Sequence, residues 1–392
     1  MPVFGIICEF NPIHLGHQYL LHTAKEMGAD TVVCVMSGNT TQRGEWATCH
    51  KYLRAEAAVR AGADLVLELP FPWCSSAAEG FACGGIGVLR HFADTVLFGS
   101  ECGDLSLLQR AADVATSPDF RQTYQQALTD GQGAAKAYAD CLAAYGIPPL
   151  SSNDLLGVAY LCAAKEQNAD LAFQTVQRQG TAYRADTLSD TEFPSALAIR
   201  QLWKQERFSE TERFLPKECT ELFRTAIQNG ELTSEKEWET AWLSFFRLHQ
   251  GNELAHYAGA EGGLANRICA TAKQACDFDS WFQTLRTKRY TDAHIRRTML
   301  ACITGVPSEC EKELPQYTTL LAMNEKGQEL LSKIKRTKPF PIVTKPADAP
   351  KDTMQYRLTE TVDGLFALST KQKHPSAYMM TQKPYVQSKS ET

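Results

Sequence analysis

The sequence predicts an α/β fold, namely a Rossmann-like parallel sheet with helices on its faces. Short apolar segments at 3–8 and 31–36 have almost no polar alternation, which is typical of strands buried on both sides, and a third strand is predicted at 64–70, where Pro70 closes it. Segments in which apolar residues recur at helical spacing separate these strands. The regular alternation of strand and helix indicates a parallel sheet with crossover connections.

The first predicted strand, at 3–8, leads into a turn that carries two histidines. Pro12 ends the strand, Gly16 lets the backbone turn, and helical spacing begins after His17. His14 and His17 are three residues apart, so they can face one bound group together. The free N–H groups and the dipole of the helix start favour an anion there. Two histidine donors suit a polyphosphate whose charge rises as a phosphorus–oxygen bond breaks.

A polar loop at 37–46 follows the second predicted strand. In open parallel sheets ligands bind at the carboxyl edge of the strands, so this loop is a second candidate site, with a plain surface connection as the alternative. The helix predicted over 50–61 carries Lys51 and Arg54 near its start. They can reach a phosphate if that start faces the cleft, and otherwise they are solvated charges.

Two further predicted strands, at 94–98 and 171–176, deliver Gly99 and Arg178 to the same edge. Alanine-rich helices at about 105–147 separate them as a helical elaboration. These positions extend the candidate site along the sheet.

The segment 193–200 begins a helix at Ser195 and places Arg200 on the next turn. A hydroxyl, helix N–H groups and a guanidinium can together bind phosphate. An ordinary capped helix is the alternative.

Composition limits the partners of the chain. Its 392 residues include 40 Lys and Arg against 45 Asp and Glu, a net charge of −5, so any RNA contact must come from a local patch. We expect no DNA partner. The chain starts without a secretory pattern and has no apolar run of about 18 residues, which predicts a cytoplasmic protein and no membrane partner.

The thirteen cysteines of the chain are scattered without a CxxC pair, which favours reduced core thiols over a metal site.

The run 287–298 is the densest basic segment of the chain. Arg289, Arg296 and Arg297 can meet phosphates while Tyr290 and His294 stack on bases. A solvated basic helix is the alternative.

These patterns divide the chain into three predicted regions. Residues 1–205 form the catalytic α/β region, 206–305 form a helical region that contacts RNA, and 306–392 form a small appended α+β piece.

The motifs carry a family resemblance. His14-Leu15-Gly16-His17 resembles the HxGH motif of the nucleotidylyltransferase superfamily, and the segment 193–200 resembles its second, serine-rich signature. The ordered segments together are similar to the bacterial tRNA(Met) cytidine acetate ligase family, over the first two hundred residues and the basic run. These segments are 5–17, 35–45, 64–70, 98–101, 153–157 and 295–297.

The resemblance implies an enzyme that uses ATP and acetate to form acetyl-adenylate with release of pyrophosphate. The acetyl group then goes to the wobble cytidine of elongator tRNA(Met), giving N4-acetylcytidine. It implies that His14 and His17 are catalytic and that Mg²⁺ accompanies ATP as co-substrate, with Glu9 as the one carboxylate considered for it.

The expected site residues form three groups. The ATP contacts are Ile7, Cys8, Glu9, Phe10, Asn11, Pro12, Ile13, His14, Leu15, Gly16, His17, Gln18, Tyr19, Leu20, Gly99, Asn153, Arg178, Ser195 and Arg200. The acetate side is assigned to Ser37, Gly38 and Asn39. The tRNA contacts are Arg289, Arg296 and Arg297.

Two other functions fit the same residues. One is an adenylyltransferase that acts on a phosphorylated small molecule, for which the basic C-terminal half has no purpose. The other is a non-catalytic RNA-binding protein that keeps a nucleotide pocket. Acetate-dependent release of pyrophosphate distinguishes the ligase from the adenylyltransferase. Loss of tRNA acetylation in His14→Ala and His17→Ala distinguishes it from the non-catalytic protein.

Overall fold

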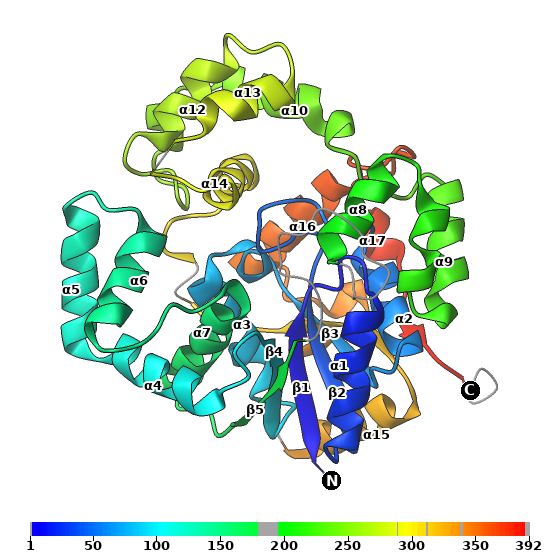
Figure 1. Cartoon of the computed structure of the whole chain (residues 1–392). Helices are drawn as coiled ribbons and strands as arrows, with labels where there is room; N and C mark the ends of the chain where they lie inside the picture. The colour runs from blue at the N-terminus through cyan, green and yellow to red at the C-terminus, as the bar shows by residue number, and fades with distance from the viewer. Residues whose placement is uncertain (1, 179–194, 288, 311–312, 338–339, 389–392) are drawn as a thin grey trace.

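The computed structural model describes residues 2–178, 195–287, 289–310, 313–337 and 340–388. Their centre is an eight-stranded sheet with the order β5-β4-β1-β2-β3-β6-β7, and β8 pairs with β6 (Figure 1). The strands are β1 (Val3–Cys8), β2 (Thr31–Ser37), β3 (Leu65–Leu69), β4 (Thr95–Ser100), β5 (Ala172–Gln177), β6 (Thr318–Met323), β7 (Ile342–Val343) and β8 (Tyr385–Val386).

The first five strands are mutually parallel, which confirms the predicted fold class. β1, β2 and β3 are buried along their whole lengths because helices cover both faces. Ile7 and Val33 pack in the cluster on one face, and Ile6 and Cys34 in the cluster on the other. Gly85 permits the close approach of a helix to β1, since a Cβ there would lie 2.7 Å from Ile7.

The helices predicted after His17, over 50–61, at about 105–147 and from Ser195 are present in the catalytic region. The helix predicted over 50–61 is α2, with His50 as its N-cap, and a short 3-10 turn precedes α3. These helices are α1 (Leu15–Glu26), α2 (Lys51–Arg60), α3 (Ala78–Leu89), α4 (Leu105–Thr116), α5 (Pro118–Thr129), α6 (Ala134–Ala144), α7 (Ser152–Glu166) and α8 (Ala196–Lys204).

Helices dominate the remaining chain. They are α9 (Lys217–Gln228), α10 (Glu235–Leu248), α11 (Gly251–Leu254), α12 (Leu264–Ala272), α13 (Phe278–Leu285), α14 (Asp292–Thr304), α15 (Glu325–Thr337), α16 (Met354–Phe366) and α17 (Tyr378–Thr381). In Figure 1, α10, α12, α13 and α14 lie beyond the carboxyl ends of the parallel strands. This places the helical region on the side of the sheet where ligands bind.

The last third of the chain joins the same sheet. β6 pairs antiparallel with β3, and β7 and β8 pair in parallel with β6. The amino-acid sequence does not predict this pairing, because nothing local to β6 identifies a partner strand about 250 residues earlier. The three regions inferred from sequence remain a proposed division of the chain.

The cysteines agree with the prediction of core thiols. The thirteen cysteines all lie in the described residues, they form no disulfide there, and most of them are buried. No cluster of three potential metal-binding side chains occurs in the described part of the chain. Among the same residues, no helix has the length and apolar character required to cross a membrane.

Candidate active site

The turn between β1 and α1 holds the two histidines in a fixed arrangement. His14 is the N-cap of α1, and its Nδ1 accepts the N–H of Gly16 at 3.0 Å. The Nδ1 of His17 accepts the N–H of His14 at 3.3 Å, which completes a capping box. The two ring centroids are 3.8 Å apart, so the imidazoles form one compact pair.

This geometry assigns the ring protons. Because both Nδ1 atoms accept hydrogen bonds, a neutral ring carries its proton on Nε2. His14 and His17 therefore each have an Nε2–H to donate. Two N–H groups at the start of α1 are already bonded within the turn. The N–H of Gly16 donates to the His14 ring, and the N–H of His17 donates to the carbonyl of His14. For these two groups the expectation of a free N–H that binds the anion is wrong.

The imidazole pair is neutral in the protein. Burial, together with repulsion from Arg178 and Arg200, lowers the pKa of His14 to about 3. Burial, His14 and Arg178 likewise hold the pKa of His17 well below its ordinary value. The histidines are thus neutral donors, and the positive charge of the site comes from the two arginines.

The arginines reach the turn from two different elements. Arg200, on α8, donates from Nη1 to the carbonyl of Asn11 at 2.6 Å. Arg178 follows β5, its N–H donates to the carbonyl of Ser100, and its side chain packs over Gly99. Because Arg178 and Arg200 both lower the pKa of His14, and Arg178 also lowers that of His17, the fold brings the predicted phosphate-binding groups together.

Ser195 caps α8, and its Oγ accepts the N–H of Ala198 at 3.2 Å. Ser195 thus makes the contact of an ordinary helix cap, as the alternative predicts. Its hydroxyl proton can still be donated to a phosphate. Phe193 and Pro194, the first residues of that predicted segment, lie outside the described residues.

A polar network joins the carboxyl end of β4 to the start of α7 and contains Glu101, which the expected site residues leave out. Asn153 donates from Nδ2 to Oε1 of Glu101 at 2.5 Å, and Ser151 donates to the other carboxylate oxygen. Asp154 accepts from Ser100 and from the N–H of Glu101. Glu101 lies two residues after Gly99, at the edge predicted to bind ligand, and that position is the signal that could have identified it.

The loop 37–46 is anchored more deeply than predicted. Ser37 and Asn39 are buried, and the Asn39 amide accepts from the N–H of Lys51 and donates to Asp363, each at 2.8 Å. A Cβ on Gly38 would lie 2.7 Å from the carboxylate of Glu68. The assignment of Ser37, Gly38 and Asn39 to the acetate side stays a prediction. The hydrogen bonds of Asn39 anchor the loop 37–46 to α2 and α16.

The prediction that Lys51 and Arg54 can reach a phosphate is wrong. Lys51 is 3% exposed and its ammonium lies 2.7 Å from Glu68 and from Asp363. Arg54 is 0% exposed and donates to the carbonyls of Glu9, Ser37, Gly38 and Cys49. Both cations are paired with groups inside the protein, because the first turn of α2 packs against the sheet.

Glu9 is poorly placed as a metal ligand. Its Oε1 accepts the N–H of Gln42 at 2.7 Å, and burial raises its pKa. The described part of the chain contains no group of three His, Cys, Asp or Glu side chains that could hold a metal ion. In ATP sites generally, magnesium is held by one or two carboxylates together with phosphates and water.

The predicted tRNA contacts differ in exposure. Arg289 is exposed and lies over the ring of Tyr290, which stacks on His294. Arg296 is 19% exposed, pairs with Glu235 at 2.7 Å and lies over Phe282. These contacts favour a structural function for Arg296.

Arg297 connects the basic run to the candidate site. Its Nη1 donates to the carbonyl of Gln42 at 3.0 Å. Gln42 in turn donates to Glu9, directly before the histidine turn. The loop 37–46 therefore joins the helical region to the phosphate-binding turn.

Comparison with known proteins places this chain in a family. The model of the HIGH Nucleotidyl Transferase family matches residues 1–383. The tRNA(Met) cytidine acetate ligase of Thermotoga petrophila is 35% identical over 86% of this chain and 85% of the relative, and that of Listeria monocytogenes is 33% identical over 92% and 94%.

Two solved structures share the fold over nearly the whole length. Apo TmcAL of Thermotoga maritima aligns with a TM-score of 0.91 at 30% identity, covering 98% of this chain and 99% of that one. The same protein bound with alpha-thio ATP aligns with a TM-score of 0.87 at 29% identity and the same coverage.

Proposed function

The chain belongs to the tRNA(Met) cytidine acetate ligase family of the HIGH nucleotidyl transferases, and we propose that its β1–α1 turn binds ATP for adenylation of acetate. The protein is an ATP-dependent ligase that acetylates the cytidine of tRNA(Met). The single observation that carries the assignment of the site is the pair of neutral imidazoles whose Nε2–H groups lie in the field of two arginines.

The reaction has two steps. A carboxylate oxygen of acetate attacks the α-phosphorus of ATP, and the bond from that phosphorus to the pyrophosphate oxygen breaks. The N4 amine of the wobble cytidine then attacks the carbonyl carbon of acetyl-adenylate, AMP leaves, and the amine loses a proton. The first step needs in-line positioning and stabilisation of charge on the leaving group, and no covalent nucleophile from the protein.

We assign those tasks to the residues around the turn. The Nε2–H groups of His14 and His17 donate to phosphate oxygens as negative charge develops, in a site from which water is largely excluded. Arg178 and Arg200 supply the positive charge, and the Ser195 hydroxyl adds a donor. Because the imidazoles start neutral, they stabilise the charge by hydrogen bonding and give up no proton.

The nucleoside is assigned to the edge beside β4. The backbone at Gly99 permits close approach, and Asn153 with Glu101 presents polar atoms that suit ribose or base. Glu101 is already positioned by Ser151 and Asn153, so a sugar hydroxyl that donates to it would meet an oriented carboxylate.

The tRNA is assigned to the helical region. Arg289 is exposed beside the stacked rings of Tyr290 and His294, which together offer a cation and an aromatic platform to RNA. Arg297 lies between this platform and the loop 37–46. Elongator tRNA(Met) and acetate are the substrates that this arrangement is proposed to join.

The decisive experiment is incubation of the purified chain with ATP, labelled acetate and unmodified tRNA(Met), followed by nucleoside analysis. N4-acetylcytidine and acetate-dependent pyrophosphate are expected. Pyrophosphate release that needs a phosphorylated small molecule, or tRNA binding without acetylation, would reject the proposal.

Two substitutions test the role of the Nε2–H groups. His14→Asn and His17→Asn keep an acceptor near Nδ1 and remove the distal donor, so the turn is preserved while kcat for adenylation falls by about 10²–10³. His22→Asn, at an exposed position further along α1, is the matched control with unchanged kcat. Wild-type rates in both site variants would contradict the assignment.

A further inference from the structure

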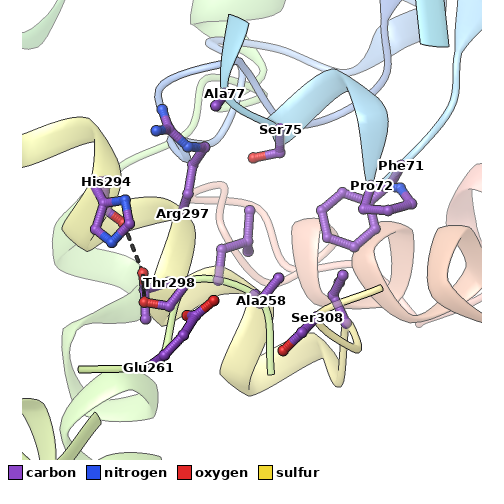
Figure 2. Close-up of a pocket in the computed structure, with 14 residues that line it drawn as sticks. Phe71, Pro72, Ser75, Ala77, Ala258, Glu261, His294, Arg297, Thr298 and Ser308 are labelled. Atoms are coloured by element: carbon purple, nitrogen blue, oxygen red, sulfur yellow. Dashed lines mark hydrogen bonds between the residues drawn. The ribbon is translucent and has the colours of Figure 1, made fainter. Parts of the chain in front are cut away.

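A cavity of about 190 Å³ lies between the catalytic and helical regions (Figure 2). Its walls come from the loop after β3, from the glycine-bearing loop before α12, and from α14. In Figure 2, Phe71 and Pro72 face His294 across this space, with Glu261 and Ser308 at its lower side. No residue of the β1–α1 turn lines this cavity, whereas His294 and Arg297 of the basic run do.

The size of the cavity limits what it can hold. It corresponds to roughly six water molecules and is smaller than the ~300–1,000 Å³ typical of drug-sized ligands. A single ring system fits, whereas a nucleoside triphosphate does not. The described residues also lack a cluster that could bind a metal ion there.

The lining suits a flat heteroaromatic ring. Phe71 supplies an aromatic surface, and Ala258, Leu300 and Val306 supply apolar contact. His294 stacks on Tyr290 at 5.1 Å between ring centroids, and burial and Arg297 lower its pKa, so it presents a neutral ring to the cavity.

Polar groups at the rim match the edge of a nucleobase. The carboxylate of Glu261 can accept from an exocyclic amine or a ring N–H, and Ser308 carries a hydroxyl. Arg289 lies close to Gly262, the neighbour of Glu261, so a phosphate beside the base would meet a cation. Bases in RNA loops are bound in this way, by stacking combined with contacts to their edges.

We propose that this cavity receives one unstacked nucleobase from the anticodon loop of the tRNA substrate. The inference rests on the proposed function, because it requires that the chain bind tRNA. It adds a defined base-binding pocket to a surface that sequence motifs identify only as basic.

The cavity is connected to the catalytic turn by hydrogen bonds. Ser75, in its wall, donates to the carbonyl of Thr41 at 3.0 Å, and Arg297 donates to that of Gln42 at 3.0 Å. Gln42 donates to Glu9 beside the histidine turn. A base held here therefore lies against Ser75 and Arg297, the two residues that donate hydrogen bonds to the loop 37–46.

The test is a double-mutant cycle between the cavity and the RNA. Unmodified anticodon stem-loops of tRNA(Met) are made with an abasic site at each loop position in turn, and their affinity is measured by fluorescence anisotropy. For the wild-type chain, base removal at one position is expected to weaken binding by about 5- to 150-fold, as for loss of one stacked base.

Cavity-filling variants complete the cycle. Ala258→Phe, and independently Ala77→Phe at the exposed mouth, should weaken binding of the intact stem-loop and abolish the extra effect of that abasic site. The matched control is Ala139→Phe on an exposed face of α6, which should reproduce the wild-type pattern. Circular dichroism spectra identify any variant that fails to fold, and the other variant then carries the test.

Three outcomes would overturn the inference. The first is an abasic series without a sensitive position, and the second is a set of folded cavity variants that keep the wild-type pattern. The third is an abasic effect that disappears when ATP is saturating, which would assign the cavity to the adenine ring of the co-substrate. Acetate-dependent ATP–pyrophosphate exchange without RNA is measured in parallel. If the wild-type chain lacks this exchange, the proposed function has failed, whatever the RNA data show.

Discussion

Lys51→Met is expected to lower the free energy of unfolding by about 3–5 kcal/mol, because it leaves two buried carboxylates without their shared cation. Lys51, Glu68 and Asp363 are 3%, 1% and 6% exposed, and the ammonium lies 2.7 Å from each carboxylate. Methionine fills most of the lysine volume, so loss of charge dominates over loss of packing. The same substitution also weakens the attachment of the last third of the chain to α2.

The loss should depend on pH in a defined direction. Burial already raises the pKa of Glu68, and removal of the ammonium raises it further. The native state of the variant then binds a proton that the unfolded chain releases, so its stability falls as pH rises through the raised native pKa. The difference from wild type is therefore larger at about pH 8 than at about pH 5.5.

Urea unfolding followed by circular dichroism measures these differences. Lys165→Met is the matched control, since Lys165 pairs with Asp113 while the two side chains are 43% and 62% exposed, and it should cost at most about 1 kcal/mol. Adding Asp363→Asn to Lys51→Met should recover part of the loss. The buried ion cluster of Lys51, Glu68 and Asp363 would be refuted by equal losses of unfolding free energy in the two lysine variants. It would also be refuted if the double variant recovered none of the loss.

Three further predictions concern the turn, the loop and the basic run. His14 has a pKa of about 3, so kcat/KM for ATP in acetate-dependent exchange should show no His14 ionisation between about pH 5.5 and 8; a wild-type ionisation near 6.5 that is absent in His14→Asn would contradict this. Gly44→Ala should cost about 2–4 kcal/mol in unfolding free energy, since φ is +73° and its Cβ would meet the backbone of α14. Gly28→Ala, also at positive φ but with open space, should cost less, and equal costs would exclude the contact with α14. Arg289→Met should weaken tRNA binding and reduce the slope of log affinity against log salt concentration by about 1. Arg296→Met should mainly lower the unfolding free energy, by about 1–3 kcal/mol. The reverse pattern would make Arg296 the RNA contact and Arg289 the structural residue.

The sequence predicts the parallel part of the fold well, because its signals are local. Apolar strands, the glycine and proline of the first turn, and the capped helix that follows are each encoded within about a dozen residues. The pairing of His14 with His17 follows from their spacing on one helix start. The side of the sheet at which Gly99 and Arg178 meet the turn follows from the parallel order of the strands.

Charge assignments required the packed structure. Lys51 and Arg54 have the pattern of solvent-facing or phosphate-binding cations, yet both are buried and paired within the protein. The protonation state of His14 likewise depends on burial and on Arg178 and Arg200, which lie more than 150 residues away in the chain. Desolvation and distant charges leave no mark on local sequence spacing.

What the sequence by itself determined is the turn at His14 and His17, its place after a buried strand, and through these the family and its chemistry. Only the tertiary structure decided that β6 completes the sheet, that Asp363 anchors Asn39, and that a cavity lies between α14 and the loop after β3. The reason is physical: a turn is specified by residues adjacent in the chain, whereas a buried ion pair or a cavity depends on how distant elements pack.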